Sequence, residues 1–464
     1  MTQQPTTHAL VIGGSMAGLW AARVLSDHFD HVTVLERDQL PEHAEHRPGT
    51  PQDKHIHILL ERGSTIMETL FPGIGAELRA AGARRIDLAL DTRMKVRGRW
   101  MQRYASGRRS YACSRILLES TVRRHLSGRS NVTLRGGARV QGLVAEQGRI
   151  SGVRVRWSGE HAEQIESADF VVDASGRGSK AAHWLNAVGY DRPEETVIDA
   201  KLGYASRRYR PPQDKTYDWH TMAIGQYAPD HTRAGLISQA ENGDWLVLLA
   251  GIKSDYPPTD ADAFDAYAKT IDPEFYATLQ SAEPIDNIVG YRRTENRWLH
   301  YERLPHWPDR FVVVGDATCG FNPIYGQGMT VAAMAAEALD KAFKRSKGRI
   351  DGVAPRYQQA YHKVVEPAWI LSASSDLEWL EQNAATTPAE RFAGWYMPKL
   401  LNSMTIDRRV HMAFISVSNL SEPLSALFQP GIMVRVLRHW WRSRKQTDAA
   451  TASGKAIPVH AHGS

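Results

Sequence analysis

With 464 residues, 42% of them hydrophobic and 23% charged, the chain has an ordinary composition for a soluble globular protein and is too long for a single compact core. Its two cysteines, Cys113 and Cys319, lie far apart, which excludes a disulfide framework and a Cys-x-x-Cys zinc site and favours a reducing, cytoplasmic location. The formal net charge of +6 comes without a nucleic-acid-binding motif, so we do not expect nucleic acid as a ligand. Because the cysteines have no metal-ligand spacing, we do not expect a metal ion either.

The beginning of the chain predicts a βαβ unit. Met1–Thr7 is polar and lacks the features of a secretory signal, and no apolar run in the sequence reaches the length of a membrane span. His8–Ile12 and His31–Leu35 are short apolar segments typical of buried strands, and Leu19–Leu25 between them has helical spacing. This order is that of a dinucleotide-type fold.

The next segments alternate between helical and extended patterns. His46–Gly63 predicts a loop that becomes helical near His57, and Cys113–Leu126 has apolar residues at helical spacing. The basic run Lys95–Arg109 is expected to form a solvated hairpin. Alternating residues with glycines at the turns predict strands joined by hairpins over Val132–Trp157.

The second half predicts an insertion and then a return to the first pattern. A buried strand at Phe170–Val172 precedes a segment rich in aromatic residues and prolines, 197–288, with a strand at Trp245–Ala250. The dinucleotide-type pattern resumes with a strand at Phe311–Val314 and a long Ala-rich helix at Met329–Phe343. The remainder of the chain has helical character.

A first glycine-containing turn, Gly13-Gly14-Ser15-Met16-Ala17-Gly18, lies between the first strand and helix. In a dinucleotide fold such glycines allow a tight turn, close approach of pyrophosphate and packing of helix on strand, and the helix N-terminus favours anions. Ser15 is small, and its hydroxyl can donate to a phosphate oxygen. Glu36 has the spacing of a ribose-binding acid, with Arg37 beside it. The alternatives are an ordinary strand–helix turn and a solvated strand end.

A second turn, Asp173-Ala174-Ser175-Gly176-Arg177-Gly178-Ser179, directly follows the strand at Phe170–Val172. Its glycines and serines can present backbone N–H groups to an anion. Taken alone, the pattern is also that of an ordinary strand-to-helix turn.

A third turn combines Gly315-Asp316-Ala317 with Asn322-Pro323-Ile324-Tyr325-Gly326-Gln327-Gly328-Met329. An acid at a strand end can accept hydrogen bonds from a polyol chain, and glycines let the backbone approach a planar ring. The following helix directs its positive end at that ring, which in a flavin enzyme is the N1–C2=O edge. The alternative is a structural turn whose buried aspartate needs a partner.

In this order, the three turns resemble those of the FAD-dependent aromatic hydroxylases, or class A flavin monooxygenases, over most of the chain up to about Lys344. The resemblance implies an FAD cofactor with NAD(P)H as transient reductant. Residues that it assigns to the cofactor are Gly13, Ser15, Met16, Ala17, Gly18, Glu36, Arg37, Gln52, Arg115, Asp173, Asp316, Pro323, Gly326, Gln327, Gly328 and Met329. Cys319 and Thr330 depart from the family pattern, in which His and Asn are frequent.

Together with the second turn, Asp173–Ser179, two further runs are similar to the squalene-epoxidase-like branch, which includes the polyene epoxidases of polyether antibiotic pathways. They are Arg47-Pro48-Gly49-Thr50-Pro51-Gln52-Asp53-Lys54-His55-Ile56-His57 and Ala112-Cys113-Ser114-Arg115. This resemblance implies a flavin C4a-hydroperoxide that delivers one oxygen atom to an alkene.

The expected fold class is therefore α/β, with a Rossmann-like FAD-binding domain, an inserted mixed β-sheet domain and a C-terminal helical region. The FAD-binding domain is discontinuous, over 1–190 and 289–345, and encloses a substrate-binding sheet domain at 191–288. Residues 346–445 are expected to be helical, and 446–464 to form a disordered tail because they lack large apolar residues.

No catalytic residue is assigned, because the oxidant resides on the cofactor and epoxidation requires no dedicated base. His55, His57 and Pro323 are candidates for positions beside the flavin. The two histidines share a face only if their segment is extended, and packing is their favoured role. The basic aromatic run Val434–Arg442 is expected to dock on the protein rather than lie on a membrane surface.

These inferences predict a monooxygenase that uses NAD(P)H and O2 to epoxidise or hydroxylate an apolar, natural-product-like molecule, a polyene or a polycyclic compound. The main alternative is a flavin-dependent reductase of isoprenoid or polycyclic substrates. A flavin halogenase is disfavoured because the Trp-x-Trp-x-Ile-Pro stretch is absent. A flavin-binding protein without activity is the remaining alternative, and a separate reductase as partner stays open.

Overall fold

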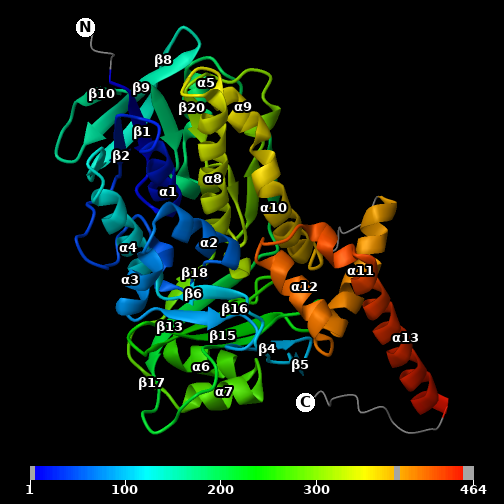
Figure 1. Cartoon of the computed structure of the whole chain (residues 1–464). Helices are drawn as coiled ribbons and strands as arrows, with labels where there is room; N and C mark the ends of the chain where they lie inside the picture. Colours follow the sequence, from blue (N-terminus) through cyan, green and yellow to red (C-terminus); the bar gives the residue numbers. More distant parts are fainter. Residues whose placement is uncertain (1–5, 381–386, 453–464) are drawn as a thin grey trace.

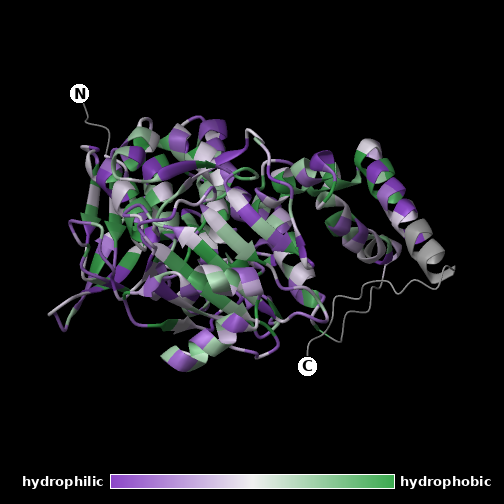
Figure 2. Cartoon of the chain, turned by 90° about the horizontal axis from the view of Figure 1, so that it is seen from below, coloured by the Kyte–Doolittle hydropathy of each residue, from purple (hydrophilic) through white to green (hydrophobic). Residues whose placement is uncertain are grey.

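The computed structural model describes residues 6–380 and 387–452. It has two layers built on β-sheets and a group of helices, α11 to α13, that projects from one side (Figure 1). Hydrophobic residues concentrate in the strands at the centre of the body, whereas hydrophilic residues dominate the loops around them (Figure 2). The expected α/β fold with a C-terminal helical region is confirmed.

A five-stranded parallel sheet forms the first layer, in the order β20-β11-β1-β2-β7. Its strands are β1 (His8–Ile12), β2 (His31–Leu35), β7 (Val132–Arg135), β11 (Phe170–Asp173) and β20 (Phe311–Val313). The predicted buried strands β1, β2, β11 and β20 are thus confirmed, and they lie in one sheet. All of these strands run in one direction, so their carboxyl ends share one edge.

The two faces of this sheet are covered differently, as the alternation in β1 shows. Ala9 and Val11 face helices, whereas Leu10 and Ile12 face a small antiparallel sheet, and all four are buried. The helical face carries α1 (Met16–Leu25), α4 (Arg115–Ser127) and α8 (Gly328–Ser346). The other face carries β8 (Ala138–Glu146), β9 (Arg149–Trp157), β10 (Glu163–Ser167) and α5 (Ala181–Ala187).

An eight-stranded sheet forms the second layer, in the order β17-β13-β16-β15-β14-β4-β5, with β18 also paired to β13. Its strands are β4 (Thr92–Val96), β5 (Arg99–Trp100), β13 (Gly203–Arg210), β14 (Thr221–Ile224), β15 (Arg233–Gln239), β16 (Trp245–Gly251), β17 (Glu283–Pro284) and β18 (Val289–Tyr291). Helices α6 (Ala261–Lys269) and α7 (Pro273–Gln280) cover its outer face. The inner face turns toward Ile56 and Ile324 of the first layer.

The strands β4 and β5 come from the part of the chain assigned by sequence to the cofactor-binding domain. They form the expected basic hairpin, but β4 also pairs in parallel with β14 of the inserted segment. Hydrophobic periodicity identifies a strand without identifying its sheet. The proposed boundary at residue 190 therefore cuts across this pairing.

The prediction that a helix begins near His57 is wrong, because the helix begins later in the chain. A short 3-10 helix, η1 (Pro51–Lys54), is followed by irregular backbone, with His55 extended, and α2 (Glu61–Leu70) begins four residues after His57. The segment lies between the layers, where the Leu60 N–H donates to the Thr330 hydroxyl of α8 at 3.1 Å. Tertiary contacts have here overridden local propensity.

Smaller elements connect the layers: α3 (Ile74–Ala80), β3 (Arg84–Asp87), β6 (Arg109–Ala112), β12 (Glu195–Ile198), β19 (Asn296–Leu299) and β21 (Cys319–Gly320). The C-terminal helices are α9 (Val353–Ala360), α10 (His362–Leu377), α11 (Pro388–Met404), α12 (Arg408–Ser418) and α13 (Pro430–Ala452). Within the described ranges, no helix is long and apolar enough to cross a membrane.

The helix α13 extends beyond the predicted end at Lys445. Residues 446–452 are helical, in contrast to the expected disorder, because helix formation there needs only permissive residues such as Ala and Gln and no large apolar ones. The rest of the expected tail, 453–464, lies outside the described residues. Val436 is fully buried, and Arg435 and His439 contact Asp407, so this part of α13 docks on α11 and α12 as expected.

Asp407 joins these helices by two kinds of contact. Its carboxylate accepts the N–H groups of Arg409 and Val410 at the start of α12, and it pairs with Arg435 and His439 of α13. We expect Asp407→Ala to lose the cap, about 1 kcal/mol, and the ion pairs as well. Faster limited proteolysis of the C-terminal helices would show this loss.

The matched control is Asp260→Ala, which removes a similar cap from α6 in a region without such ion pairs. Proteolysis of α11–α13 at the wild-type rate in Asp407→Ala would contradict the prediction.

Candidate active site at the carboxyl edge of the parallel sheet

The three glycine-containing turns meet at the carboxyl edge of the parallel sheet. A Cβ at Gly13 would lie 2.6 Å from the Ala174 carbonyl oxygen, so the first and second turns touch. A Cβ at Gly315 would lie 2.9 Å from the Ala17 Cβ, so the third turn touches the first. Three segments far apart in the sequence thus form one surface.

The turn between β1 and α1 is shaped by close backbone contact. Gly13 has a φ of +103°, and its N–H donates to the Leu35 carbonyl oxygen of β2 at 2.8 Å. A Cβ at Gly18 would lie only 1.8 Å from the Gly13 carbonyl oxygen. Glycine is therefore required at both positions, as the dinucleotide interpretation expects.

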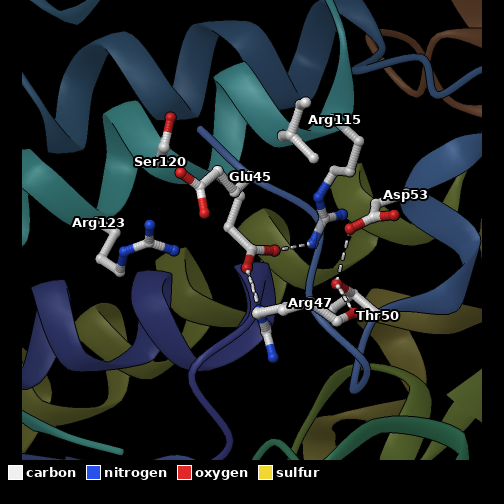
Figure 3. A pocket seen from close by; sticks show the side chains of 9 residues that line it. Glu45, Arg47, Thr50, Asp53, Arg115, Ser120 and Arg123 are labelled. Carbon is white, nitrogen blue, oxygen red and sulfur yellow. Dashed lines mark hydrogen bonds and ion pairs between the residues drawn. The ribbon is translucent and has the colours of Figure 1, made fainter. Parts of the chain in front are cut away.

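Buried charges surround the start of α1. Glu119 of α4 accepts hydrogen bonds from Arg47 at 2.8 Å, from Arg115 and from the Ser15 hydroxyl at 3.0 Å. Figure 3 shows Arg47, Arg115 and Arg123 around this small pocket. Although burial opposes ionisation, Arg115 and Arg47 hold the pKa of Glu119 at about 2.

The Arg115 side chain still has an unused donor. Its Nε is buried and has no hydrogen-bond partner among the described residues, while its terminal nitrogen contacts Ser15 at 2.7 Å. A guanidinium beside a helix N-terminus favours a phosphate group. These donors fit the pyrophosphate of FAD. The pyrophosphate would accept hydrogen bonds from Arg115 and Ser15, which now bond to Glu119.

The remaining residues predicted for the adenosine half lie near this turn. Glu36 is buried, accepts the Gly14 N–H at 2.7 Å and lies 3.4 Å from Arg47. Arg37 is exposed and donates to the Gly49 carbonyl at 3.3 Å. Gln52 lies in η1 and is partly buried.

Asp173 organises the second turn from within. Its carboxylate is fully buried and accepts hydrogen bonds from the Ser175 N–H and the Ser179 hydroxyl. Burial raises the pKa of Asp173. The side chain thus points into its own turn, and its contact with the cofactor stays a prediction.

Arg177 connects the second turn to the third. Its guanidinium donates to the carbonyl oxygens of Glu295 and Phe321, and its Nε lies 3.7 Å from the Asp316 carboxylate. Asp316 in turn faces the start of α8, since a Cβ at Gly328 would lie 3.6 Å from its Oδ1. This carboxylate is placed to accept hydrogen bonds from a polyol.

Residues 322–328 of the third turn, which we call the flavin-lining loop after their predicted role, include a glycine in the left-handed region. Gly326 has a φ of +68°, and a Cβ there would lie 3.4 Å from the Ile58 Cβ. The Gln327 Oε1 is buried without a hydrogen-bond partner among the described residues, which is costly unless a ligand supplies a donor. Pro323 lies in this loop, within η5 (Pro323–Tyr325), and Met329 follows it in α8.

Asp376 of α10 fixes the start of the same loop. It is fully buried and accepts hydrogen bonds from Asn322 at 3.0 Å, Tyr325 at 2.8 Å and Asn296 at 2.7 Å. The side-chain Oδ1 of Asn296 then accepts hydrogen bonds from the Asn322 N–H and the Ser372 hydroxyl. A buried network in which each member is paired gives a loop one well-defined conformation.

The two predicted histidines lie in the extended segment beside this loop. His55 Nδ1 contacts the Ser206 hydroxyl at 2.9 Å, and the His57 Nδ1 contacts the His55 carbonyl oxygen at 3.0 Å. Burial lowers the pKa of His55 to about 4 and that of His57 to about 3. Neutral rings with such low basicity favour packing over acid–base chemistry.

A cavity of about 240 Å³ lies between this segment, the inner face of the large sheet and the C-terminal helices. Its walls are mostly apolar and include Ile58, Leu60, Ile86, Leu88, Met94, Met101, Ala223, Leu236, Leu246, Met404, Phe414 and Ile415. Cys113 also lines it, and burial raises the pKa of that thiol to about 12. The cavity therefore suits an apolar molecule, and its cysteine is not a nucleophile.

Residues 6–346 match the FAD-binding domain family, and the chain belongs to that family of FAD-dependent oxidoreductases and monooxygenases. The site agrees with this, because it joins a dinucleotide-type turn, buried arginine donors and a glycine loop with an unsatisfied amide oxygen. FAD is accordingly the cofactor.

Comparison with individual proteins extends the match to nearly the whole chain. Protein Rv3254 of Mycobacterium tuberculosis is 33% identical over 466 aligned residues, which cover 95% of this chain and 96% of that protein. Among solved structures, the flavin-dependent brominase Bmp2 has a TM-score of 0.65 at 15% identity, covering 94% of this chain and 100% of its own. The oxygenase of 2-methyl-3-hydroxypyridine-5-carboxylic acid has a TM-score of 0.57 at 18% identity, covering 85% and 98%. At these identities the structures share the fold.

Several residues of this site were not identified from the sequence. Glu119 could have been found from the sequence, because it lies one helical turn after Arg115 on a predicted helix, the spacing of an ion pair. Asp376, Asn296 and His411 carried no such signal, because their partners lie far away in the chain.

Gly18→Ala tests the cofactor site directly. The new methyl group would overlap the Gly13 carbonyl, displace α1 from the turn and remove most of the bound FAD. The ratio of flavin to protein absorbance after purification measures this loss. Gly394→Ala is the control, because its methyl group would meet no atom within 4 Å. Full FAD content in a folded Gly18→Ala protein would show that the site is elsewhere.

Asp376 gives a pH-dependent prediction. Burial raises its pKa from 3.8 to about 6, so the folded protein binds this proton more tightly than the unfolded chain does. The contribution of Asp376 to stability therefore falls as the pH rises from about 4 to about 6. Relative to Asp376→Asn, wild type is expected to lose about 2 kcal/mol of stability between pH 4.5 and pH 7, as thermal unfolding at these two pH values would measure.

Asp340→Asn is a control of opposite sign. Hydrogen bonds from Lys344 and His28 outweigh burial and lower the pKa of Asp340, so its contribution to stability is present above the ordinary carboxyl pKa and is lost at lower pH. A pH-independent difference between wild type and Asp376→Asn would contradict the assignment of Asp376.

Proposed function

We propose that this flavoprotein is a monooxygenase that inserts oxygen into an apolar small molecule, a polyene or a polycyclic compound. The observation that carries the proposal is the apolar cavity beside the flavin-lining loop. Ile58 and Leu60 line the cavity; Ile58 also lies next to Gly326 of that loop, and the Leu60 N–H donates to Thr330 of α8, directly after it. A molecule in the cavity would thus lie next to the ring system that the loop holds.

Bound FAD supplies the activation of dioxygen in this reaction. NAD(P)H provides two electrons, one atom of O2 enters the substrate, and the other leaves as water. Arg115 would hold the FAD phosphates and Asp316 the ribitol, and the apolar walls of the cavity would exclude water from the substrate.

The polar groups in the cavity favour epoxidation over hydroxylation of a phenol. Oxygen transfer to an alkene requires no proton from the substrate, whereas phenol hydroxylation is assisted by a base. His55, His57 and His411 line the cavity, and burial lowers the pKa of each to about 4 or below. They are therefore weak bases, and the cavity suits a substrate that needs none.

The fold shared with a brominase makes halogenation the contrasting candidate. Flavin halogenases use a lysine to carry the oxidised halide and a Trp-x-Trp-x-Ile-Pro stretch. None of the described residues that line the cavity is a lysine, and the stretch does not occur in the sequence. Both observations favour oxygen insertion into the substrate.

Oxygen consumption tests the proposal. Purified holoenzyme is mixed with NADH or NADPH and a panel of polyenes and polycyclic aromatics, and O2 uptake and oxygenated product are measured together. We expect stimulation of O2 uptake by the matching substrate, with product formed. Substrate-dependent oxidation of NAD(P)H that continues equally without O2 would identify a reductase, and brominated product only in the presence of bromide would identify a halogenase.

Ala223→Phe tests the role of the cavity. Ala223 lies on β14 with its side chain at the cavity wall, so a phenyl group there would fill the space. We expect substrate-stimulated O2 uptake to fall at least about tenfold while FAD content stays at the wild-type level. Unchanged stimulation in this variant would place the substrate elsewhere.

A further inference from the structure

A buried histidine, His411, lies where α12 forms one end of the apolar cavity. His411 is only 8% exposed and lines the cavity together with Phe414, Ile415 and Ser418 of the same helix. Its ring packs against Tyr104 edge to face, with centroids 5.6 Å apart. The ring is thus held in place from one side while it borders the cavity on another.

His411 differs from His55 and Gln239, which also line the cavity, because its side chain makes no hydrogen bond to any described residue. Its Nδ1 is enclosed without a hydrogen bond, and no bond to either ring nitrogen occurs in the part of the chain that the structure describes. By contrast, the His55 Nδ1 contacts the Ser206 hydroxyl, so only its Nε2 is unpaired among the described residues, and Gln239 donates to the Trp219 carbonyl. A buried imidazole without partners is costly unless a ligand satisfies it.

The position of His411 along α12 relates it to the flavin-lining loop. At the other end of the helix, Asn419 accepts the Glu61 N–H at 3.1 Å, next to Leu60, which is bonded to Thr330 of α8. His411 precedes Asn419 by eight residues, which corresponds to about 12 Å along a helix. The cavity therefore has an end near the loop and an end about two helical turns away.

We propose that His411 is the residue that recognises a hydroxyl or carbonyl group at the end of the substrate remote from the carbon that is oxidised. The substrate class is then an elongated apolar molecule with one terminal oxygen function, rather than a pure hydrocarbon. A neutral imidazole has one donor and one acceptor, so it can pair with either group. This inference rests on the proposed function in that it takes this cavity to be the substrate cavity.

A matched pair of small aromatic probes tests the inference without turnover. Isothermal titration calorimetry with oxidised holoenzyme, in the absence of NAD(P)H, gives the Kd of 2-naphthol and of 2-methylnaphthalene, which differ by a hydroxyl in place of a methyl group. In His411→Phe, which keeps a ring against Tyr104, we expect the preference for 2-naphthol to fall about tenfold relative to wild type. His411→Asn is expected to restore part of that preference.

Phe414→Leu is the control, since it alters an apolar wall of the cavity and should weaken both probes alike. An equal preference in wild type and His411→Phe would overturn the inference, and so would failure of both probes to bind wild type. Oxygen uptake is measured separately on the same proteins. Loss of the monooxygenase proposal would appear there, as absence of substrate-stimulated O2 uptake with any compound, while the binding ratio reports only on His411.

Discussion

Parallel strands end on the same side of their sheet, and the site of this protein depends on that constraint. The strands β1, β2, β11 and β20 are separated by long stretches of sequence, yet their carboxyl ends are adjacent because the order β20-β11-β1-β2 places β1 and β11 in the middle. The strands β1, β11 and β20 each lead into one of the three turns, and β2 leads into Glu36. The contacts of Gly13 with Ala174 and of Gly315 with Ala17 leave no space between these turns for larger residues.

The charges of the site follow from the same arrangement. Anionic groups are stabilised at helix N-termini, and α1 and α8 both begin at this edge. Buried Arg47 and Arg115 add to the positive potential, but both are paired with carboxylates, those of Glu119 and Glu36. A buried ion pair contributes little net stability, so this cluster is better understood as preparing guanidinium groups for a phosphate ligand than as holding the fold together.

Sequence patterns predicted those parts of the site whose structure depends only on residues close together in the chain. The turn at Gly13–Gly18 and the strands beside it could be recognised because their spacing reflects backbone geometry within a few residues. The segment around His57 was wrongly predicted as helix. Its extended conformation depends on contacts with Thr330 and the large sheet, which the local pattern does not record. The roles of Asp376 and His411 depend wholly on packing between distant helices and loops, which no periodicity within one segment records.

Asp376 and His411 share one further property, since both lie beyond the residues that match the FAD-binding family. Asp376 belongs to α10 and hydrogen-bonds to the flavin-lining loop, whereas His411 belongs to α12 and lines the cavity. Substitutions in α12 can therefore change the cavity wall without changing the residues that fix the flavin-lining loop. Related proteins can acquire new substrates by divergence of α11 and α12, while the segment through α10 keeps the cofactor in place.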